Sequence, residues 1–481
     1  MKEKNLFSLK HLSLGKILLI FLLIYIALIV IPYIQHKKVA ISYQKGFEQR
    51  NFYSDTIGTE RVAYINDNTD ALLCRLHMIE EAEEEIILST FDFNSDKAGR
   101  DMMAALLHAA DRGVSVRVLV DGANGFLDLT RNDWFQAFVS HDNVSIRIYN
   151  PINLLKPWNL QARLHDKYVI VDQKMYLLGG RNTTNLFLGD YSKSKNIDRE
   201  LFVYETAKRD SASIYQLTDY FESVWSLSDT KEYHFKKMTD NVQTCKNKLE
   251  KHYDTLKATY PKAYQTWDYE TFMMQTNKIS LLSNPILSAN KQPWMWYSLH
   301  QLMMQGKNVS IYTPYIICII SWWRDSFLMY QDLSALHEKG IPVEIITNDV
   351  ASGANPWGCT DYLNQKENIW DTGSKVYEFM GKHSCHTKAV LIDDRMSIVG
   401  SYNLDMRSTY QDTELMLAVD CPELNAMIRD EMEQDKTYSK TMGADGEYDY
   451  GENYVSKELS FGKRVFYAVL RVVTVPIRRF L

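Results

Sequence analysis

Cysteine is scarce in this sequence and is never paired at short spacing. Only six cysteines occur among 481 residues, and none of them forms a CxxC pair. Zinc ribbons and small disulfide-stapled domains both need closely spaced cysteines, so neither is predicted. His383, Cys385 and His386 lie close together, but their spacing matches no usual zinc pattern. We therefore predict no metal site and no metal cofactor.

An excess of positive charge is also missing. The formal net charge is −6, and the chain therefore lacks the global basic field that usually holds a nucleic-acid backbone. The composition does not favour disorder either, because 46% of the residues are hydrophobic. A chain of this length and composition can bury a large core. The sequence thus indicates a globular protein without a nucleic-acid partner.

Long apolar runs are absent except for one near the N-terminus. Residues 17–34 form eighteen positions without a charge, which is close to the minimum for a helix that crosses a bilayer. We predict a basic tail at 1–15, one transmembrane helix at 16–36 and a juxtamembrane linker at 37–57. A cleaved signal peptide is the alternative, but no small-residue cleavage site follows the run. Lysines flank both ends, so the membrane sidedness stays open.

The end of the chain is unlike the rest. Residues 461–481 mix basic and apolar side chains around Pro476, which suits a basic amphipathic segment lying in an anionic membrane interface. A helix packed on the protein with a solvated basic face explains the same pattern equally well. The preceding residues 435–460 are acidic and rich in tyrosine, and we predict an exposed linker there.

A repeated pattern of strands and helices fills the middle of the chain. A predicted strand at 85–93, a helix at 101–112 ended by Gly113 and a strand at 114–121 form a βαβ unit. The same order recurs in a strand at 309–315, a helix that ends at Gly340 and a strand at 342–347. We predict two tandem α/β domains with mixed sheets and flanking helices, at 58–229 and 279–434, joined by a helical connector at 230–278.

Each domain carries one copy of the pattern HxKxxxxD. The first copy is His165, Lys167 and Asp172, and the second is His386, Lys388 and Asp393, displaced by 221 positions. Each copy is followed by a GxxN pattern at the same displacement, Gly179 to Asn182 and Gly400 to Asn403. One copy could occur by chance, whereas two copies in register indicate a function.

The spacing is typical of a β-hairpin that carries a phosphate site. Residues i and i+2 of a strand share a face, so each histidine points with its lysine to one surface. Asp172 and Asp393 face away and are predicted to be structural turn residues. The returning strands would bring Asn182 beside His165 and Asn403 beside His386. Each hairpin then offers an imidazole, an ammonium group and an amide to a phosphate, without a metal.

A nucleophilic imidazole also needs an acceptor on its second nitrogen. Glu200 lies 35 positions beyond His165, and Glu414 lies 28 positions beyond His386, each followed by Leu. We predict that Glu200 and Glu414 are equivalent and that seven residues are inserted in the first domain.

These motifs resemble the paired HKD motifs of the phospholipase D superfamily, over residues 61–420, and among its members the bacterial cardiolipin synthases in particular. The resemblance implies a pseudo-twofold fold with one active site between the domains and no metal. It implies that His165 attacks phosphorus and that His386 protonates the leaving alcohol, which predicts a bell-shaped pH profile. Lys167, Lys388, Asn182 and Asn403 would bind the phosphate oxygens, Glu200 and Glu414 would orient the imidazoles, and Gly180 and Ser401 would line the substrate site. The first domain departs from the family pattern because Gly180 replaces the usual serine.

The sequence therefore predicts a phosphatidyltransferase of a bacterial cell membrane. It would make cardiolipin from phosphatidylglycerol and a second phospholipid, for example phosphatidylethanolamine, through a phosphohistidine intermediate. A hydrolase that uses water as acceptor, acting as a phosphodiesterase or nuclease, is the alternative. A scaffold without activity would require a lost catalytic group, and none is missing. The oligomeric state is left open by the sequence.

Overall fold

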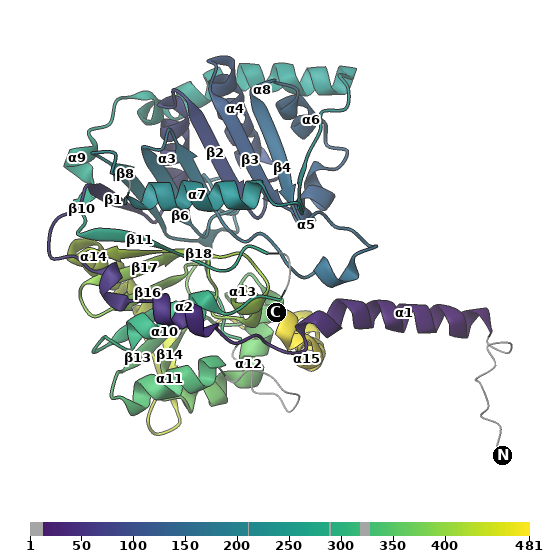
Figure 1. Cartoon of the computed structure of the whole chain (residues 1–481). Helices are drawn as coiled ribbons and strands as arrows, with labels where there is room; N and C mark the ends of the chain where they lie inside the picture. Colours follow the sequence, from purple (N-terminus) through teal and green to yellow (C-terminus); the bar gives the residue numbers. More distant parts are fainter. Residues whose placement is uncertain (1–12, 210, 288–289, 318–327) are drawn as a thin grey trace.

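The protein consists of two α/β units that lie one above the other, with a single apolar helix projecting from their side (Figure 1). The computed structural model describes residues 13–209, 211–287, 290–317 and 328–481. Each unit contains one mixed nine-stranded sheet covered by helices. The predicted fold class, two tandem α/β domains of mixed sheets flanked by helices, is confirmed.

The first sheet has the strand order β10-β1-β8-β6-β5-β2-β3-β4-β9. Its centre is parallel from β2 to β4, and the hairpin β5–β6 runs antiparallel beside β2. The strands are β1 (Glu60–Ile65), β2 (Glu85–Thr90), β3 (Ser115–Asp121), β4 (Val144–Tyr149), β5 (Tyr168–Val171), β6 (Met175–Gly179), β8 (Glu200–Glu205), β9 (Thr230–Glu232) and β10 (Met274–Gln275).

The second sheet repeats this order as β11-β18-β17-β16-β12-β13-β14-β19-β20. Eight strands correspond one to one, while β10 and β20 extend opposite edges of the two sheets. Two short strands, β7 (Asn196–Ile197) and β15 (Ser384–Cys385), pair in parallel and connect the two domains. The remaining strands are β11 (Lys278–Ser283), β12 (Val309–Tyr312), β13 (Val343–Asn348), β14 (Lys375–Phe379), β16 (Ala389–Ile392), β17 (Met396–Gly400), β18 (Leu415–Asp420), β19 (Ser439–Met442) and β20 (Tyr448–Tyr450).

Helices cover the outer face of each sheet, and two further helices fill the space between the sheets. One buried cluster belongs to each outer layer, and a third cluster joins residues of both sheets with α7 (Ser213–Trp225) and α14 (Pro422–Thr437). This shared core holds the two domains as one body. The outer helices are α3 (Asn68–Glu80), α4 (Lys97–Asp111), α6 (Asp133–Val139) and α8 (Asp240–Thr259) in the first domain, and α10 (Trp294–Met303), α11 (Leu328–Glu338) and α12 (Pro356–Trp370) in the second.

The repeated βαβ units form where the sequence predicts them. Gly113 follows α4 with φ of 98°, and Gly340 follows α11 with φ of 80°. A side chain would be strained in this left-handed conformation, so glycine ends both helices at the same place. The strands themselves are shorter than predicted, because β2 ends at Thr90 and β12 ends at Tyr312.

The apolar run forms α1 (Leu14–Val30), which continues into a short 3-10 turn at Ile31–Tyr33. By length and composition it could cross a membrane, and the helix has no buried residue. Residues 1–12 of the predicted basic tail lie outside the described residues. At the base of α1, the C-terminal helix α15 (Phe461–Ile477) packs on α12 with an apolar face left exposed (Figure 1).

Two segments differ from the predicted boundaries. The predicted connector 230–278 contributes β9 and β10 to the first sheet, and its helix α8 buries Val242, Leu249 and Leu256 in the first domain. The predicted linker 435–460 contains β19 and β20, which extend the second sheet. The polar composition of both segments gives no signal for these elements, because edge strands and surface helices bury only one side.

Candidate active site

Two β-hairpins, β5–β6 and β16–β17, position the site. Their turns contain Asp172 with φ of 52° and Asp393 with φ of 53°. The Asp172 carboxylate accepts hydrogen bonds from the backbone of residues 83–85, and the Asp393 carboxylate accepts them from residues 307 and 308. Both aspartates thus tie a hairpin turn to the segment that leads into the neighbouring strand.

The motif histidines lie just before these hairpins, where the two domains touch. His165 precedes β5, and its backbone N–H donates to Thr413 Oγ1 of the other domain at 3.1 Å. His386 directly follows β15, and its N–H donates to the carbonyl of Ile197 at 2.6 Å. The histidines are therefore held by contacts between the domains, and not within the regular strands that the spacing predicts.

Each imidazole pairs with a carboxylate from the opposite domain. His165 Nδ1 lies 2.9 Å from Glu414 Oε1, and His386 Nδ1 lies 2.6 Å from Asp198 Oδ2. Both carboxylates are fully buried, whereas the imidazole side chains are 15% and 20% exposed. The second nitrogen of each ring therefore remains available for chemistry at a partly open surface.

The prediction that Glu200 orients an imidazole is wrong. Glu200 forms a bidentate pair with Arg75, at 2.8 and 2.6 Å. The sheet registers explain why Asp198, and not Glu200, is the equivalent of Glu414. Gly179 pairs with Glu200, whereas Gly400 pairs with Met416. Glu200 thus corresponds to Met416, and Asp198 corresponds to Glu414. The insertion in the first domain is five residues and not seven, since Asp198 is 33 positions from His165 and Glu414 is 28 from His386.

Asp198 is the partner of His386 that the sequence pattern does not identify. It belongs to the run Asp-Arg-Glu-Leu, in which the second acidic residue, and not Asp198, aligns with Glu414 before leucine. The next residue, Arg199, contacts Thr387 at 2.9 Å and Glu431 at 2.6 Å, both in the second domain. The register between β6 and β8 decides which of the two acidic residues, Asp198 or Glu200, corresponds to Glu414.

The difference between Gly180 and Ser401 follows from these carboxylates. The Ser401 hydroxyl donates to Glu414, so it supports the carboxylate and is not directed at substrate as predicted. At Gly180, an added Cβ would lie 2.3 Å from Asp198 Oδ2. The Asp198 carboxylate therefore lies where a serine side chain at position 180 would be. Glycine with aspartate, and serine with glutamate, are two ways to hold one carboxylate at an imidazole.

Replacing Gly180 with serine is expected to displace Asp198 from His386 and to slow turnover about tenfold or more, because tenfold corresponds to only ~1.4 kcal/mol. Gly180→Ala should have the same effect, since the Cβ and not the hydroxyl causes the clash. Initial rates at matched amounts of folded protein, checked by thermal unfolding, measure this. A Gly180→Ser enzyme with unchanged rate would contradict the assignment of Asp198.

The two lysines lie beside the imidazoles, and their charges act on both half-sites. Lys167 Nζ donates to the carbonyl of His165 at 2.5 Å, and Lys388 Nζ lies 2.7 Å from His386 Nδ1. In addition to burial, which has the largest effect, Lys388 lowers the pKa of His165 and Lys167 lowers that of His386. The four groups therefore form one cluster between the domains.

The two asparagines are less tightly held. Asn403 donates weakly to Tyr315 and Ser408, both at 3.4 Å. The side-chain oxygens of Asn182 and Asn403 are buried without a hydrogen-bond partner among the described residues. Among the residues that the structure describes, no hydrogen bond joins either asparagine to a histidine. Their position beside the imidazoles therefore stays a prediction.

Burial and neighbouring charge keep the imidazoles neutral. Burial, with Lys167 next, lowers the pKa of His165 well below its usual value, and burial with Lys388 lowers that of His386 to about 3. Burial also lowers the pKa of Lys167 to about 7 and of Lys388 to about 8, and raises that of Glu414 to about 8. A neutral imidazole can attack phosphorus, and the ammonium groups are poised to lose their charge just above neutral pH.

These shifts predict an alkaline limb for the free enzyme. A lysine whose pKa is lowered keeps its charge below that pKa and loses it as the pH rises through it. The sequence predicts that Lys167 and Lys388 bind a phosphodiester in their charged form, so kcat/KM is expected to fall as the pH rises through about 7 to 8. A pH series of kcat/KM measures this limb. A value that stays constant up to about pH 10, the usual lysine pKa, would contradict the assignment.

Comparison with known proteins agrees with this arrangement. A family model described as "Cardiolipin synthase, PLD-like domain" matches residues 76–225 and 299–436, once in each domain. Among relatives, cardiolipin synthase C of Escherichia coli (strain K12) is 24% identical over 459 residues, covering 85% of this chain and 94% of its own. An uncharacterized protein of Helicobacter pylori (strain ATCC 700392 / 26695) is 25% identical over 408 residues, which cover 76% and 77% of the two chains.

One solved structure shares the fold over almost its full length. Phosphatidylserine synthase of Haemophilus influenzae Rd KW20 superimposes with a TM-score of 0.60 over 87% of this chain and 95% of its own, at 16% identity. The family match covers more than half of the 481 residues, and both matched parts contain one of the two histidine motifs. The chain therefore belongs to the phospholipase D-like family of cardiolipin synthases.

Proposed function

We propose that this protein makes cardiolipin by moving a phosphatidyl group from one phospholipid to phosphatidylglycerol through a phosphohistidine. The main observation behind the proposal is that each histidine pairs with a carboxylate of the opposite domain, His165 with Glu414 and His386 with Asp198. In this proposal the two imidazoles, which are fixed through Nδ1, present Nε2 to one phosphorus atom, as a two-step transfer requires. Family membership makes a phospholipid the natural substrate class.

In the first step, His165 Nε2 attacks the phosphorus of the donor lipid. The new P–N bond forms as the P–O bond to the head-group alcohol breaks, and His386 gives that alcohol its proton. The Nδ1–H of His165 donates a hydrogen bond to Glu414 at 2.9 Å, and this contact stabilises the cation that attack creates. The ammonium groups of Lys167 and Lys388 stabilise the charge that develops on the non-bridging oxygens.

In the second step, His386 is the base. It takes the proton of a phosphatidylglycerol hydroxyl, whose oxygen attacks phosphorus while the P–N bond breaks. The pKa of His386, which burial lowers to about 3, must rise for its acid role. The bound phosphodiester provides this increase, since its negative charge offsets that of Lys388 and favours a protonated imidazole.

Lipid product analysis tests the proposed function. Purified full-length protein in vesicles of phosphatidylglycerol, with and without phosphatidylethanolamine, should produce cardiolipin that mass spectrometry detects. Free glycerol identifies phosphatidylglycerol as donor, and free ethanolamine identifies phosphatidylethanolamine. Phosphatidic acid without cardiolipin would overturn the proposal in favour of a hydrolase with water as acceptor.

We also propose that α1 crosses the membrane once and places the site beside the lipid. Its exposed apolar surface and the exposed apolar face of α15 at its base support this placement. Deletion of residues 1–30 is expected to move the protein from the alkali-resistant membrane pellet to a fraction released by alkaline carbonate, because α15 alone would bind only the interface. Quantitative immunoblotting measures the distribution. A truncated protein that remains fully alkali-resistant would contradict a single-span anchor.

A further inference from the structure

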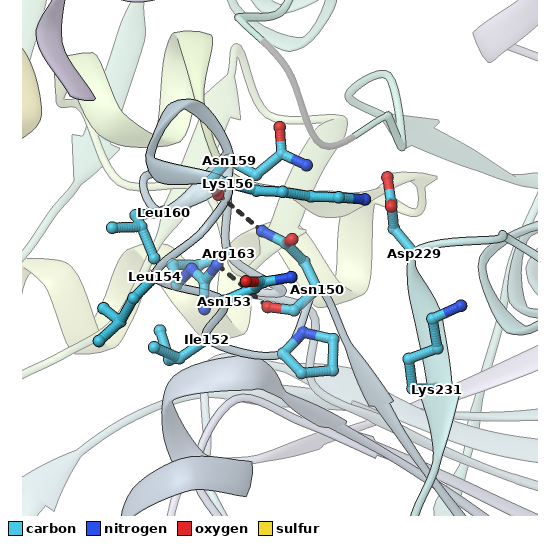
Figure 2. Close-up of a pocket in the computed structure, with 11 residues that line it drawn as sticks. Asn150, Ile152, Asn153, Leu154, Lys156, Asn159, Leu160, Arg163, Asp229 and Lys231 are labelled. Atoms are coloured by element: carbon cyan, nitrogen blue, oxygen red, sulfur yellow. Dashed lines mark hydrogen bonds between the residues drawn. The ribbon is translucent and has the colours of Figure 1, made fainter. Parts of the chain in front are cut away.

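A cavity next to the base of α1 is separate from the histidine cluster. It has a volume of about 320 Å³ and is enclosed by the loop that joins β4 to His165 and by the start of β9 (Figure 2). Among the described residues, none of the paired histidine, lysine and carboxylate groups lines it. Its charged lining residues are Lys156, Arg163, Asp229 and Lys231, and the loop also contributes aliphatic side chains.

The cavity contains an arginine with unused donor capacity. Arg163 is only 5% exposed, and its Nη2 donates to the carbonyl of Asn150 at 3.2 Å. Its Nε and Nη1 make no hydrogen bond within the described parts of the chain, and the Asp121 carboxylate lies 3.6 Å from Nη1. Buried guanidinium groups normally satisfy their donors. Three N–H groups, one on Nε and two on Nη1, are therefore buried without a hydrogen bond to the described residues, and a small turn of the guanidinium toward the cavity would offer them to an anionic oxygen.

Charged and aliphatic groups occupy different sides of the cavity. Figure 2 shows Ile152, Leu154 and Leu160 on one side, with Asp229 and Lys231 on the other and Lys156 extended between them. The lining contains three cations and one carboxylate, and with the buried Asp121 behind Arg163 the balance is still positive, so the cavity favours a negatively charged ligand. A glycerophospholipid offers this combination, with a phosphodiester for the cations, a head-group hydroxyl for Asp229 and acyl chains for the aliphatic side.

The cavity also lies at the level where head groups would be. Tyr25 of α1 donates to the carbonyl of Leu154 at 2.9 Å, and Tyr33 donates to that of Trp158 at 3.1 Å. Tyr25 lies five residues before the end of α1, so the contact with Leu154 is about 7.5 Å along the helix axis from that end. The side chains of Leu154 and Leu155 are 66% and 87% exposed there. If α1 spans a bilayer, these leucines reach its boundary and the cavity faces the head groups.

We propose that this cavity binds the phosphodiester head group of a second, non-reacting anionic glycerophospholipid. The inference rests on the proposed membrane placement of α1. The Arg163 backbone also joins the domains, because its N–H donates to Asp412 and its carbonyl accepts from Thr413 at 2.9 Å. A lipid bound to the Arg163 side chain thus braces the segment that carries His165.

Photo-crosslinking of the full-length protein tests this site. The probe is phosphatidylglycerol with a diazirine near its glycerol, in vesicles of phosphatidylcholine, and the protein carries His165→Ala to prevent turnover. Labelled peptides from residues 150–163 and 229–231 are expected. Lys156→Ala/Lys231→Ala should reduce this labelling about tenfold, because two charge-assisted contacts are lost. The matched control Lys237→Ala/Lys262→Ala removes two exposed lysines that do not line the cavity, and it should label normally.

Competition identifies the ligand source. Unlabelled phosphatidylglycerol should displace the probe, and phosphatidylcholine should not. Displacement by inorganic phosphate would assign the cavity to a free phosphate and would overturn the lipid assignment. Equal labelling of both double variants would also overturn it. Labelling of the cavity peptides is independent of product formation, so a wild-type enzyme that makes no cardiolipin would reject the proposed function and leave this site intact.

Discussion

Cardiolipin formation by the His165→Ala variant is expected to be slower than wild type by a factor on the order of 10⁴ or more, because loss of a nucleophile removes the covalent route. The effect should be on kcat, since the lysines that bind phosphate remain in place. His386→Ala should be similarly impaired with an ordinary donor lipid, as the leaving alcohol then departs without a proton. Steady-state rates of cardiolipin formation measure both.

The two histidine variants should differ with an activated donor. A lipid whose leaving group is a nitrophenol does not need a protonated leaving oxygen. His386→Ala should therefore release nitrophenol in a burst equal to the amount of enzyme, whereas His165→Ala should show no burst. A burst from His165→Ala and none from His386→Ala would reverse the proposed roles.

Asp198→Asn is expected to lower kcat by a factor on the order of 10² to 10⁴, as in other sites where a carboxylate fixes a catalytic imidazole. The amide keeps the shape of the side chain but has no negative charge to stabilise a protonated His386. Glu414→Gln should have a comparable effect through His165, from the opposite domain. Rates per mole of folded protein measure both variants.

Glu200→Gln is the matched control for these substitutions. It changes a buried carboxylate to an amide two residues away from Asp198, but it breaks the pair with Arg75 at 2.6 Å. A buried ion pair that loses one partner typically costs about 3–5 kcal/mol of stability. We therefore expect a lower unfolding midpoint with kcat largely retained by the folded fraction. Normal kcat in Asp198→Asn together with low kcat in Glu200→Gln would restore the sequence-based choice of Glu200.

The repeat and its hairpins are predictable from the sequence because their signals are local. Glycine at 113 and 340 ends a helix by its own backbone freedom, and Asp172 and Asp393 form turns with neighbouring backbone. The constant displacement of 221 positions between the two motifs is enough to indicate two domains. The same local reasoning identifies the histidine and lysine of each motif, since the spacing within a hairpin does not depend on the rest of the fold.

The partners of the imidazoles could not be predicted in the same way. They come from the opposite domain, so their identity depends on how two sheets pack together. Two acidic residues, Asp198 and Glu200, lie on one segment with their side chains in different environments. Choosing between them requires the register of β6 against β8, which a five-residue insertion obscures. Gly180 departs from the family motif in sequence, whereas in the structure it provides the room that Asp198 needs.

We propose that one phosphatidyl group is carried on one histidine between the two domains. The direct test is rapid quenching of the enzyme with phosphatidylglycerol in denaturant at neutral to mildly alkaline pH, which preserves phosphoramidates, followed by peptide mass spectrometry. We expect a phosphatidyl adduct on His165, at up to one per chain, and we expect it on the same residue in the His386→Ala variant. Turnover without any adduct, or an adduct on His386, would contradict it.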